Sequence, residues 1–331
     1  MKISVIIPVR NEEQSIGQLL DGLTNQSLRP AEIVITDGGS SDRTAAIIAA
    51  YDQTAAPIRL IREGPGFPGR NRNLAAAQAT SEWLAFIDAG ITPEPDWLEL
   101  LAKRVQLESE ADVDVDVVYG SYEPVADTLF KRCSVMAYVP PPVEIEGRLV
   151  RSRSVVSLLM KRSVWQSVGG FPEDLRSAED LLFMDKIEQA NFRIVNEPDA
   201  LVHWQVQATP WLTFTRFVVY ARNNMRAGLW RQWQAAIFMR YGALLFSALP
   251  AFWFGAQWLL LTLSLWIAML VTRGAVAIWR NRVCYPAGIF ANAVRLLVLV
   301  PVIAMLDAAT FVGTIDWAVR DLNRQDAMGA K

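Results

Sequence analysis

Three short apolar segments in the first ninety residues predict buried parallel strands. They cover residues 3–9, 32–36 and 83–87, and each ends abruptly at polar residues or glycine. Continuous apolar runs of this length are typical of strands that are covered on both faces. Because parallel strands end at one common edge of a sheet, we expect the residues that follow them to form a ligand site.

Helical and extended patterns alternate as far as about position 205. Asn11 is placed to cap a helix that begins at Glu12 and presents an apolar face. Further strands are expected at residues 58–61, 116–122 and 154–160. The alternation predicts an α/β fold rather than an all-α or all-β domain. Residues 123–178 fit it less well, and are either an acceptor-binding region or a long loop.

The remainder of the chain is strongly apolar. No charged residue occurs in residues 241–272, a run longer than one membrane span needs and shorter than two full spans. Pro250 and Gly255 near its middle favour a tight hairpin of two helices over about 235–272. A third apolar segment, about 286–315, contains Arg295 and Asp307, and is therefore either a span that faces a helix bundle or partly interfacial.

Arginine placement predicts the orientation of this hairpin. Positive residues precede its first helix and follow its second, which places both ends in the cytoplasm. Residues 208–233 mix aromatic residues with arginines and suit an amphipathic helix in the headgroup region. We therefore expect a cytosolic domain over 1–207, this interfacial segment, and a membrane domain over 234–331. A multi-pass protein of the plasma (inner) membrane is predicted.

Composition removes several function classes. The net charge of −2 over 331 residues implies no polyanionic partner, so nucleic acid is not expected as a ligand. Cys133 and Cys284 lie far apart, and we interpret them as reduced packing thiols. The first residues lack the apolar region and cleavage site of a signal peptide, as expected for a domain kept in the cytosol.

Polar motifs follow the predicted strands in a recognisable order. They are Pro-Val-Arg-Asn-Glu-Glu from Pro8, Asp-Gly-Gly-Ser-Ser-Asp from Asp37, Arg72-Asn73, Asp88 and Glu179-Asp180. This order resembles the nucleotide-sugar-binding half of family-two glycosyltransferases over about residues 2–203. The resemblance implies the GT-A fold, which is a Rossmann-like domain with a mixed sheet, followed here by an interfacial helix and two to three transmembrane helices.

The resemblance also implies roles for single residues. It assigns nucleotide-sugar binding to a set at the strand ends, namely Pro8, Arg10, Glu12, Asp37, Arg72 and Asp88. Local structure offers alternatives, because Glu12 suits the first turn of a helix and Asp37 precedes a turn-forming glycine. Arg72 could lie on a solvated helix face, and Arg70 could serve in its place.

Asp88 matches the first aspartate of the family's Asp-x-Asp metal motif, but Gly90 replaces the second. The resemblance implies Mn²⁺ or Mg²⁺, and the loss of one carboxylate should weaken its binding. His203, the only histidine, is a candidate replacement ligand that would favour Mn²⁺, or else an ordinary packed histidine.

The resemblance assigns catalysis to Glu179 and Asp180, with Asp180 as the general base. An ordinary helix cap is the alternative for these residues. One base and direct displacement imply inversion at the anomeric carbon. The Gln-x-x-Arg-Trp motif of processive members is absent from the sequence, so a single transfer is predicted.

The leading hypothesis is a membrane-bound, inverting, non-processive hexosyltransferase. Its donor would be a nucleotide-diphosphate sugar, with UDP favoured. Its acceptor would be a membrane lipid or a polyprenyl-linked acceptor of glycolipid or polysaccharide biosynthesis. The alternative is a catalytically inactive nucleotide-sugar-binding protein that anchors an assembly in the membrane. A small channel or transporter is disfavoured by the few spans. The sequence leaves the oligomeric state open.

Overall fold

The computed structural model describes residues 1–51, 56–145 and 147–329, and the chain divides into two compact units. The first unit comprises residues 1–125 and 142–205, and the second comprises residues 126–141 and 206–331. Residues 126–141, which were expected in a domain over 1–207, thus group with the second unit.

Unit 1 is built on an eight-stranded sheet of order β3-β2-β1-β4-β9-β6-β10-β5. Strands β1 to β4 are parallel to one another, and β6 is parallel to β10. Strand β9 runs antiparallel to β4 and β6, and β5 runs antiparallel to β10. This mixed sheet confirms the predicted GT-A-like α/β fold. The strands are β1 (Ile3–Val9), β2 (Glu32–Asp37), β3 (Ile58–Arg62), β4 (Trp83–Phe86), β5 (Ile91–Pro93), β6 (Val117–Val125), β9 (Leu158–Lys161) and β10 (Ile194–Gln205).

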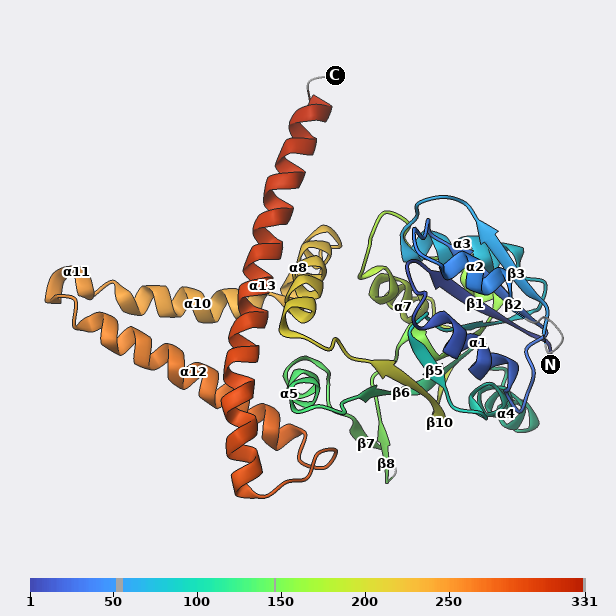
Figure 1. Ribbon diagram of the computed structural model, residues 1–331, viewed down its shortest axis with the longest axis horizontal. Coiled ribbons are helices and arrows are strands. Elements are labelled where there is room, and N and C mark those ends of the chain that lie inside the picture. The colour runs from blue at the N-terminus through green and yellow to red at the C-terminus, as the bar shows by residue number, and fades with distance from the viewer. Residues whose placement is uncertain (52–55, 146, 330–331) are drawn as a thin grey trace. The chain divides into compact units, whose positions relative to one another are not determined.

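Helices connect these strands and cover the sheet (Figure 1). Apolar side chains that recur at helical spacing explain the coverage, as in α1, where Ile16, Leu19, Leu20 and Leu23 are fully buried. A short separate ribbon pairs β7 (Val143–Ile145) with β8 (Arg148–Val150). The helices are α1 (Ile16–Thr24), α2 (Thr44–Ala49), α3 (Pro68–Gln78), α4 (Trp97–Glu110), α6 (Arg162–Ser167) and α7 (Glu179–Gln189).

The expected start of the first helix is wrong. α1 begins at Ile16, not at Glu12, and Asn11 adopts a left-handed conformation with φ of 56°. The Oδ1 atom of Asn11 accepts a hydrogen bond from the Ser41 amide at 2.8 Å instead of capping α1. Asparagine tolerates this backbone region, so a short polar turn replaces the first helical turn.

Unit 2 is helical, and its C-terminal part confirms the predicted apolar helices. Three stretches are long and apolar enough to cross a membrane, Ala235–Phe254, Trp258–Arg280 and Ile289–Arg320. Gly255, with φ of 96°, forms the turn between the first two, which make a hairpin (Figure 1). The helices are α5 (Leu129–Tyr138), α8 (Pro210–Arg226), α9 (Trp230–Trp233), α10 (Ala235–Ala248), α11 (Ala251–Phe254), α12 (Trp258–Arg280) and α13 (Ile289–Gly329).

The two ionisable residues within the third apolar segment are both buried. Asp307 is 1% exposed and accepts a hydrogen bond from Arg273 Nη2 at 2.9 Å and one from the Tyr241 hydroxyl at 3.1 Å. Arg295 is 6% exposed and donates to the Tyr285 carbonyl at 2.7 Å. Pairing of this kind is what an ionisable group in an apolar environment requires.

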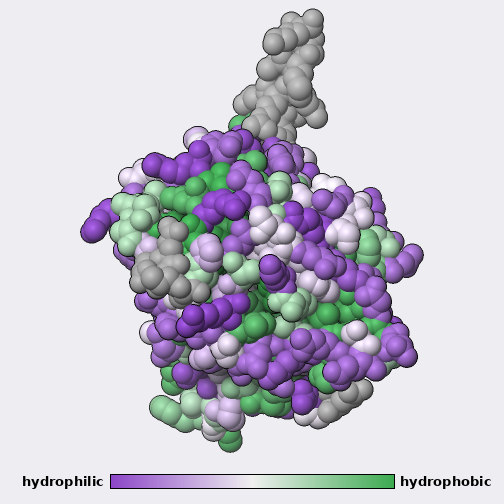
Figure 2. Space-filling view, turned by 90° about the vertical axis from the view of Figure 1, so that its right-hand side faces the viewer, coloured by the Kyte–Doolittle hydropathy of each residue, from purple (hydrophilic) through white to green (hydrophobic). Residues whose placement is uncertain are grey.

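Surface character differs between the hairpin and the face of the molecule in Figure 2. Hydrophilic side chains predominate on that face, with hydrophobic ones in smaller patches between them. The hairpin instead exposes large apolar side chains around its tip, including Phe246, Phe252 and Trp253, each at least 70% exposed. Exposed aromatic and aliphatic groups at this density are typical of contact with lipid or with another protein.

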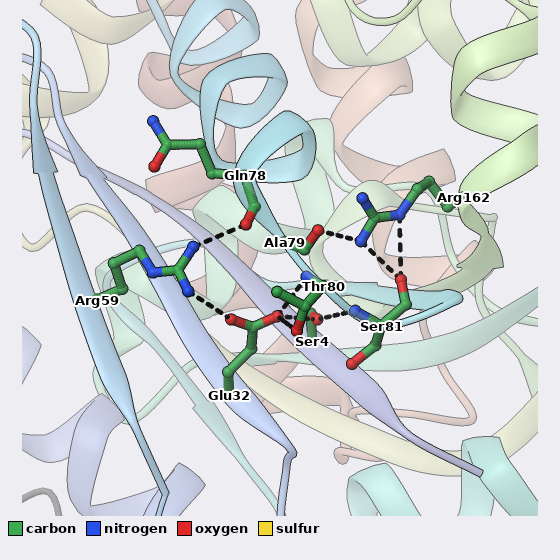
Figure 3. Close-up of polar contacts among 8 residues, drawn as sticks. All are labelled: Ser4, Glu32, Arg59, Gln78, Ala79, Thr80, Ser81 and Arg162. Atoms are coloured by element: carbon green, nitrogen blue, oxygen red, sulfur yellow. Dashed lines mark hydrogen bonds and ion pairs between the residues drawn. The ribbon is translucent and has the colours of Figure 1, made fainter.

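A polar network ties the strand starts of unit 1 together at the edge opposite the expected site (Figure 3). Glu32 is buried, and its carboxylate accepts hydrogen bonds from the Ser4 hydroxyl at 2.7 Å and from the Thr80 amide at 2.5 Å. Burial by itself would raise the pKa of Glu32, but these donors and the nearby Arg59 guanidinium outweigh it and lower the pKa.

We expect Glu32→Gln to reduce the free energy of unfolding at pH 7 by about 1–3 kcal/mol, because buried donors lose a charged acceptor. The folded-state pKa lies below the ordinary value of 4.5, so this stabilisation is complete above that pH and is lost as pH falls through the folded pKa. Denaturant titrations at pH 7 and pH 3 should therefore show a smaller difference at pH 3. The neighbouring exposed Glu82→Gln is the control, and an equal loss in both variants would contradict the assignment.

Candidate functional site

The turns after β1 and β2 are joined at the carboxyl edge of the sheet. The Asn11 amide donates to the Ser40 hydroxyl at 2.9 Å, and the Glu12 amide donates to the Thr44 hydroxyl at 2.8 Å. Pro8 is half-buried within β1, whereas Arg10 is exposed at its end. Two of the predicted motifs thus form one continuous rim, as the parallel strand order requires.

Asp37, the last residue of β2, is buried beneath this rim. Its Oδ1 atom accepts a hydrogen bond from the Ser40 amide at 2.8 Å, which is the turn-forming bond expected of an Asp-Gly sequence. A Cβ atom at Gly38 would lie 2.3 Å from Asn71 Nδ2, so glycine is needed for the close approach of this turn to α3. Asp37 therefore forms the turn, as its alternative interpretation expected.

Arg72 lies at the centre of the predicted site. Its side chain is 4% exposed, with Nη2 2.7 Å from Asp88 Oδ1 and Nη1 2.8 Å from Glu179 Oε1. The guanidinium carbon also lies 5.3 Å from the centre of the Phe171 ring. A solvated helix face is therefore wrong for Arg72, which joins the end of β4 to the start of α7.

A strained backbone conformation at the start of α7 places Glu179 next to Arg72. Ala178, which directly precedes α7, has φ of 72°, a conformation that costs free energy in a residue with a Cβ atom. Gly69 at the start of α3 packs against Pro172 and Glu179, because a Cβ there would lie 2.0 Å from the Pro172 carbonyl oxygen and 3.3 Å from Glu179 Cγ. Glu179 is buried in consequence, and Asp180, beside it, is half-buried.

The two acidic residues have unusual proton affinities. Burial raises the pKa of Glu179 despite the opposing Arg72 guanidinium, and the charge of Asp180 raises it further. Burial likewise raises the pKa of Asp180, against Arg72 and the Leu181 amide, with Asp88 adding to the rise. A carboxylate of raised pKa holds a proton more strongly, which suits it to accept one from a hydroxyl.

Asn73, the partner of Arg72 in the predicted motif, has a different role. Its Nδ2 donates to the Phe171 carbonyl at 2.9 Å, and its Oδ1 accepts from the Phe171 amide at 2.9 Å and from the Trp165 indole at 3.0 Å. These bonds hold the Gly-Gly-Phe-Pro turn that presents Phe171 to Arg72. The sequence showed this turn, but nothing in it identified the ring as a neighbour of the arginine.

Two further predicted residues lie around this centre. Glu12 Oε2 accepts from the Ser15 hydroxyl at 2.5 Å, and a Cβ at Gly90 would lie 3.7 Å from the same carboxylate oxygen. Glu12 is therefore adjacent to the turn that follows Asp88. His203, on β10, has Nε2 2.5 Å from Glu94 Oε1, so its nearest ionisable partner is Glu94.

The described residues do not fit a preformed metal site. No group of three or more His, Cys, Asp or Glu side chains among them is arranged to hold a metal ion. Asp88 is the only motif carboxylate, since Gly90 supplies no side chain, and Asp88 is already paired with Arg72. Hard divalent cations need six or more oxygen ligands, so most would have to come from a bound ligand and water.

Comparison with known proteins agrees with this architecture. Residues 4–156 match the family described as Glycosyl transferase family 2. The solved structure of the mannosyltransferase PcManGT from Pyrobaculum calidifontis, in complex with GDP-Man and Mn²⁺, aligns with a TM-score of 0.54 and 20% identity. That alignment covers 96% of this chain and 87% of the other, and it shows a shared fold.

Two curated relatives match part of the chain. The poly(ribitol-phosphate) beta-N-acetylglucosaminyltransferase TarS of Staphylococcus aureus is 29% identical over 190 residues, which are 56% of this chain and 32% of TarS. The glycosyltransferase AglE of Haloferax volcanii is 28% identical over 208 residues, which are 60% of this chain and 65% of AglE. The chain thus spans only part of the length of these relatives.

We expect Arg72→Met to lower the free energy of unfolding by about 3–5 kcal/mol, because Glu179 is left buried without its counter-charge. Adding Glu179→Gln to the same protein should restore part of the loss. Denaturant titration of both variants tests this, and a double variant no more stable than the single one would contradict the pairing. Arg70→Met is the matched control, because the Arg70–Glu63 pair is 3.8 Å long and partly exposed, and such pairs contribute little.

Proposed function

Since residues 4–156 belong to glycosyl transferase family 2, we propose that this chain is an inverting glycosyltransferase anchored in a membrane. It would transfer one sugar from a nucleotide-diphosphate sugar to a lipid or lipid-linked acceptor. The observation that supports this most is the contact of Arg72 with both Asp88 and Glu179, because it gathers the predicted donor and base motifs at one place.

The donor would bind along the joined turns after β1 and β2. Glu12 at that rim and Asp37 beneath it would provide carboxylates for the polar groups of a nucleoside, with Pro8 and Arg10 on the adjoining strand end. We favour UDP as the nucleotide, as the family resemblance suggests. The relative TarS is named as an N-acetylglucosaminyltransferase, which agrees with a sugar-transfer role without identifying the sugar used here.

The chemistry would centre on Asp180. Its carboxylate would take the proton of the acceptor hydroxyl while that oxygen forms a bond to the anomeric carbon. The bond from this carbon to the diphosphate oxygen would break, and its electron pair would leave with the nucleoside diphosphate. Attack from the face opposite the leaving group inverts the configuration. Burial and Asp88 raise the pKa of Asp180, which favours proton transfer from a hydroxyl.

The membrane part would bring the acceptor to the protein. The three apolar helices are compatible with anchoring, and the predicted side is the cytoplasmic face of the inner membrane. A lipid carrier such as a polyprenyl phosphate would then stay in the plane in which the enzyme is held. An inactive nucleotide-sugar-binding anchor is the competing function, and Gly90 in place of an aspartate is the observation that favours it.

We expect Asp180→Asn to lower kcat by about 10²–10⁴-fold while donor binding is kept, because a general base contributes that much. The measurement is product formation by detergent-purified protein with UDP- and GDP-sugars and a membrane lipid extract. Asp185→Asn, on the same helix, should retain activity. Turnover of the Asp180 variant within about tenfold of the parent would refute the base, and donor binding without transfer would favour the inactive anchor.

The raised pKa of Asp180 predicts how the activity in this assay depends on pH. Asp180 acts deprotonated, and its pKa is raised above the ordinary value of 3.8, so activity should fall on acidification at a higher pH than an ordinary aspartate would give. The measurement is kcat/KM as a function of pH, and the pH at which it falls on the acid side reports the pKa of the base.

We propose that any divalent cation is held jointly by Asp88 and the donor diphosphate, not by the protein alone. Mn²⁺ binding should then be weak without UDP. Binding is measured from the decrease in the paramagnetic resonance signal of free Mn²⁺. UDP should tighten it about 5–150-fold, a typical range for coupled sites. Asp88→Asn and UDP without protein are the controls. Tight Mn²⁺ binding in the absence of UDP would contradict shared coordination.

A further inference from the structure

α13 packs against the hairpin from the middle of α12, at Leu270, to the open end. Gly274, in the last third of α12, faces Leu296 and Leu299 of α13, where an added Cβ would lie 2.7 Å and 3.6 Å from them. The Phe311 ring lies 5.2 Å from the ring of Tyr241, in the first half of α10. These contacts span about 22 Å of α13 at 1.5 Å per residue, yet neither approaches the tip formed by α11.

α13 therefore runs across the hairpin and not alongside it (Figure 1). Its later turns pack on α8, because an added Cβ at Gly313 would lie 2.3 Å from the Val218 carbonyl oxygen and 2.8 Å from Ala221 Cβ. Arg222 of α8 also bonds Asp316 of α13 at 2.9 Å. A helix that crosses the hairpin in this way does not lie parallel to the direction in which the hairpin would enter a bilayer.

One face of α13 is exposed, and its large side chains are apolar. Phe290, Leu297, Ile315 and Val319 are between 54% and 84% exposed and recur at helical spacing on one side. From Phe290 to Val319 this apolar stripe is about 44 Å long at 1.5 Å per residue. A bilayer's hydrocarbon core is only about 30 Å thick, so an upright α13 would carry part of the stripe out of the lipid.

Two charged residues lie within the apolar stretch of α13, Arg295 near its start and Asp307 near its middle, and the other charged residues follow from Asp316 onwards. An upright helix would place Asp307 near the bilayer centre, where ionisable groups cost most. A helix in the plane of the interface places both Arg295 and Asp307 at headgroup depth.

We infer that α13 does not cross the membrane but lies along its interface, with its apolar stripe against lipid and only the α10–α12 hairpin inserted. The inference rests on the proposed membrane anchoring and not on the proposed sugar transfer. Its partner is a lipid surface, recognised through the exposed stripe and the flanking charges. α8 and α13 would then form one interfacial platform at the base of the hairpin.

Spin labels at two positions of the stripe test this in the full-length protein reconstituted in phospholipid vesicles. Leu297→Cys and Ile315→Cys are made with Cys284→Ser, and Leu260→Cys on the hairpin is the control for insertion. The two stripe positions are 18 residues apart, or about 27 Å along the helix. Depth is measured from collisions of each label with oxygen and with a water-soluble nickel complex.

We expect the labels at Leu297 and Ile315 to report the same shallow depth, and the label at Leu260 to lie deeper. Stripe labels that differ in depth by most of the bilayer thickness would overturn the inference while leaving anchoring intact. Stripe labels shielded from both collision partners would also overturn it, and would indicate a contact with a second copy of the chain. A water-exposed label at Leu260 would instead refute membrane anchoring.

Discussion

The burial of one guanidinium group determines how unit 1 is organised around its site. Arg72 is almost fully enclosed, and an enclosed guanidinium is tolerated only when carboxylates compensate it. Asp88 and Glu179 meet this need from opposite sides, which fixes the start of α7 against α3 and the end of β4. The strained Ala178 backbone follows from this constraint, because Glu179 must turn inward as the helix begins.

The same rule recurs in unit 2 with different consequences. Arg273 and Asp307 compensate each other between α12 and α13, and Arg222 and Asp316 do so between α8 and α13. The first pair joins consecutive helices and the second joins helices that are distant in sequence. Each adds a polar contact to van der Waals packing that alone is permissive. These partly buried pairs mark where α13 meets α12 and α8.

Local pattern predicted much of the fold. The apolar strands, their polar ends and the apolar hairpin follow from the hydrophobic pattern, and Asp88 lies two residues after β4, whose apolar run is clear in the sequence. The pairing of Arg72 with Glu179 could not be predicted from pattern, because it joins residues 107 positions apart. The start of α1 was missed because Asn11 bonds the neighbouring turn instead of its own helix. Likewise, hydropathy measures how apolar α13 is but not its direction relative to the hairpin.

The site contains more negative than positive side chains, and this bears on how a diphosphate could enter it. Asp88, Glu179 and Asp180 are three carboxyl groups, and Arg72 is the one guanidinium in contact with them. Burial raises the pKa of Glu179 and Asp180, and the neighbouring carboxylates add to the rise, so a proton held by one of them would reduce the negative charge. A diphosphate would add further negative charge, which Arg72 cannot offset while it remains bound to two carboxylates. Under the proposed mechanism, a cation that enters with the donor or a proton held by the acidic pair would restore the charge balance. A retained proton would leave Asp180 less able to act as a base, whereas a cation held by the donor would keep Asp180 ionised.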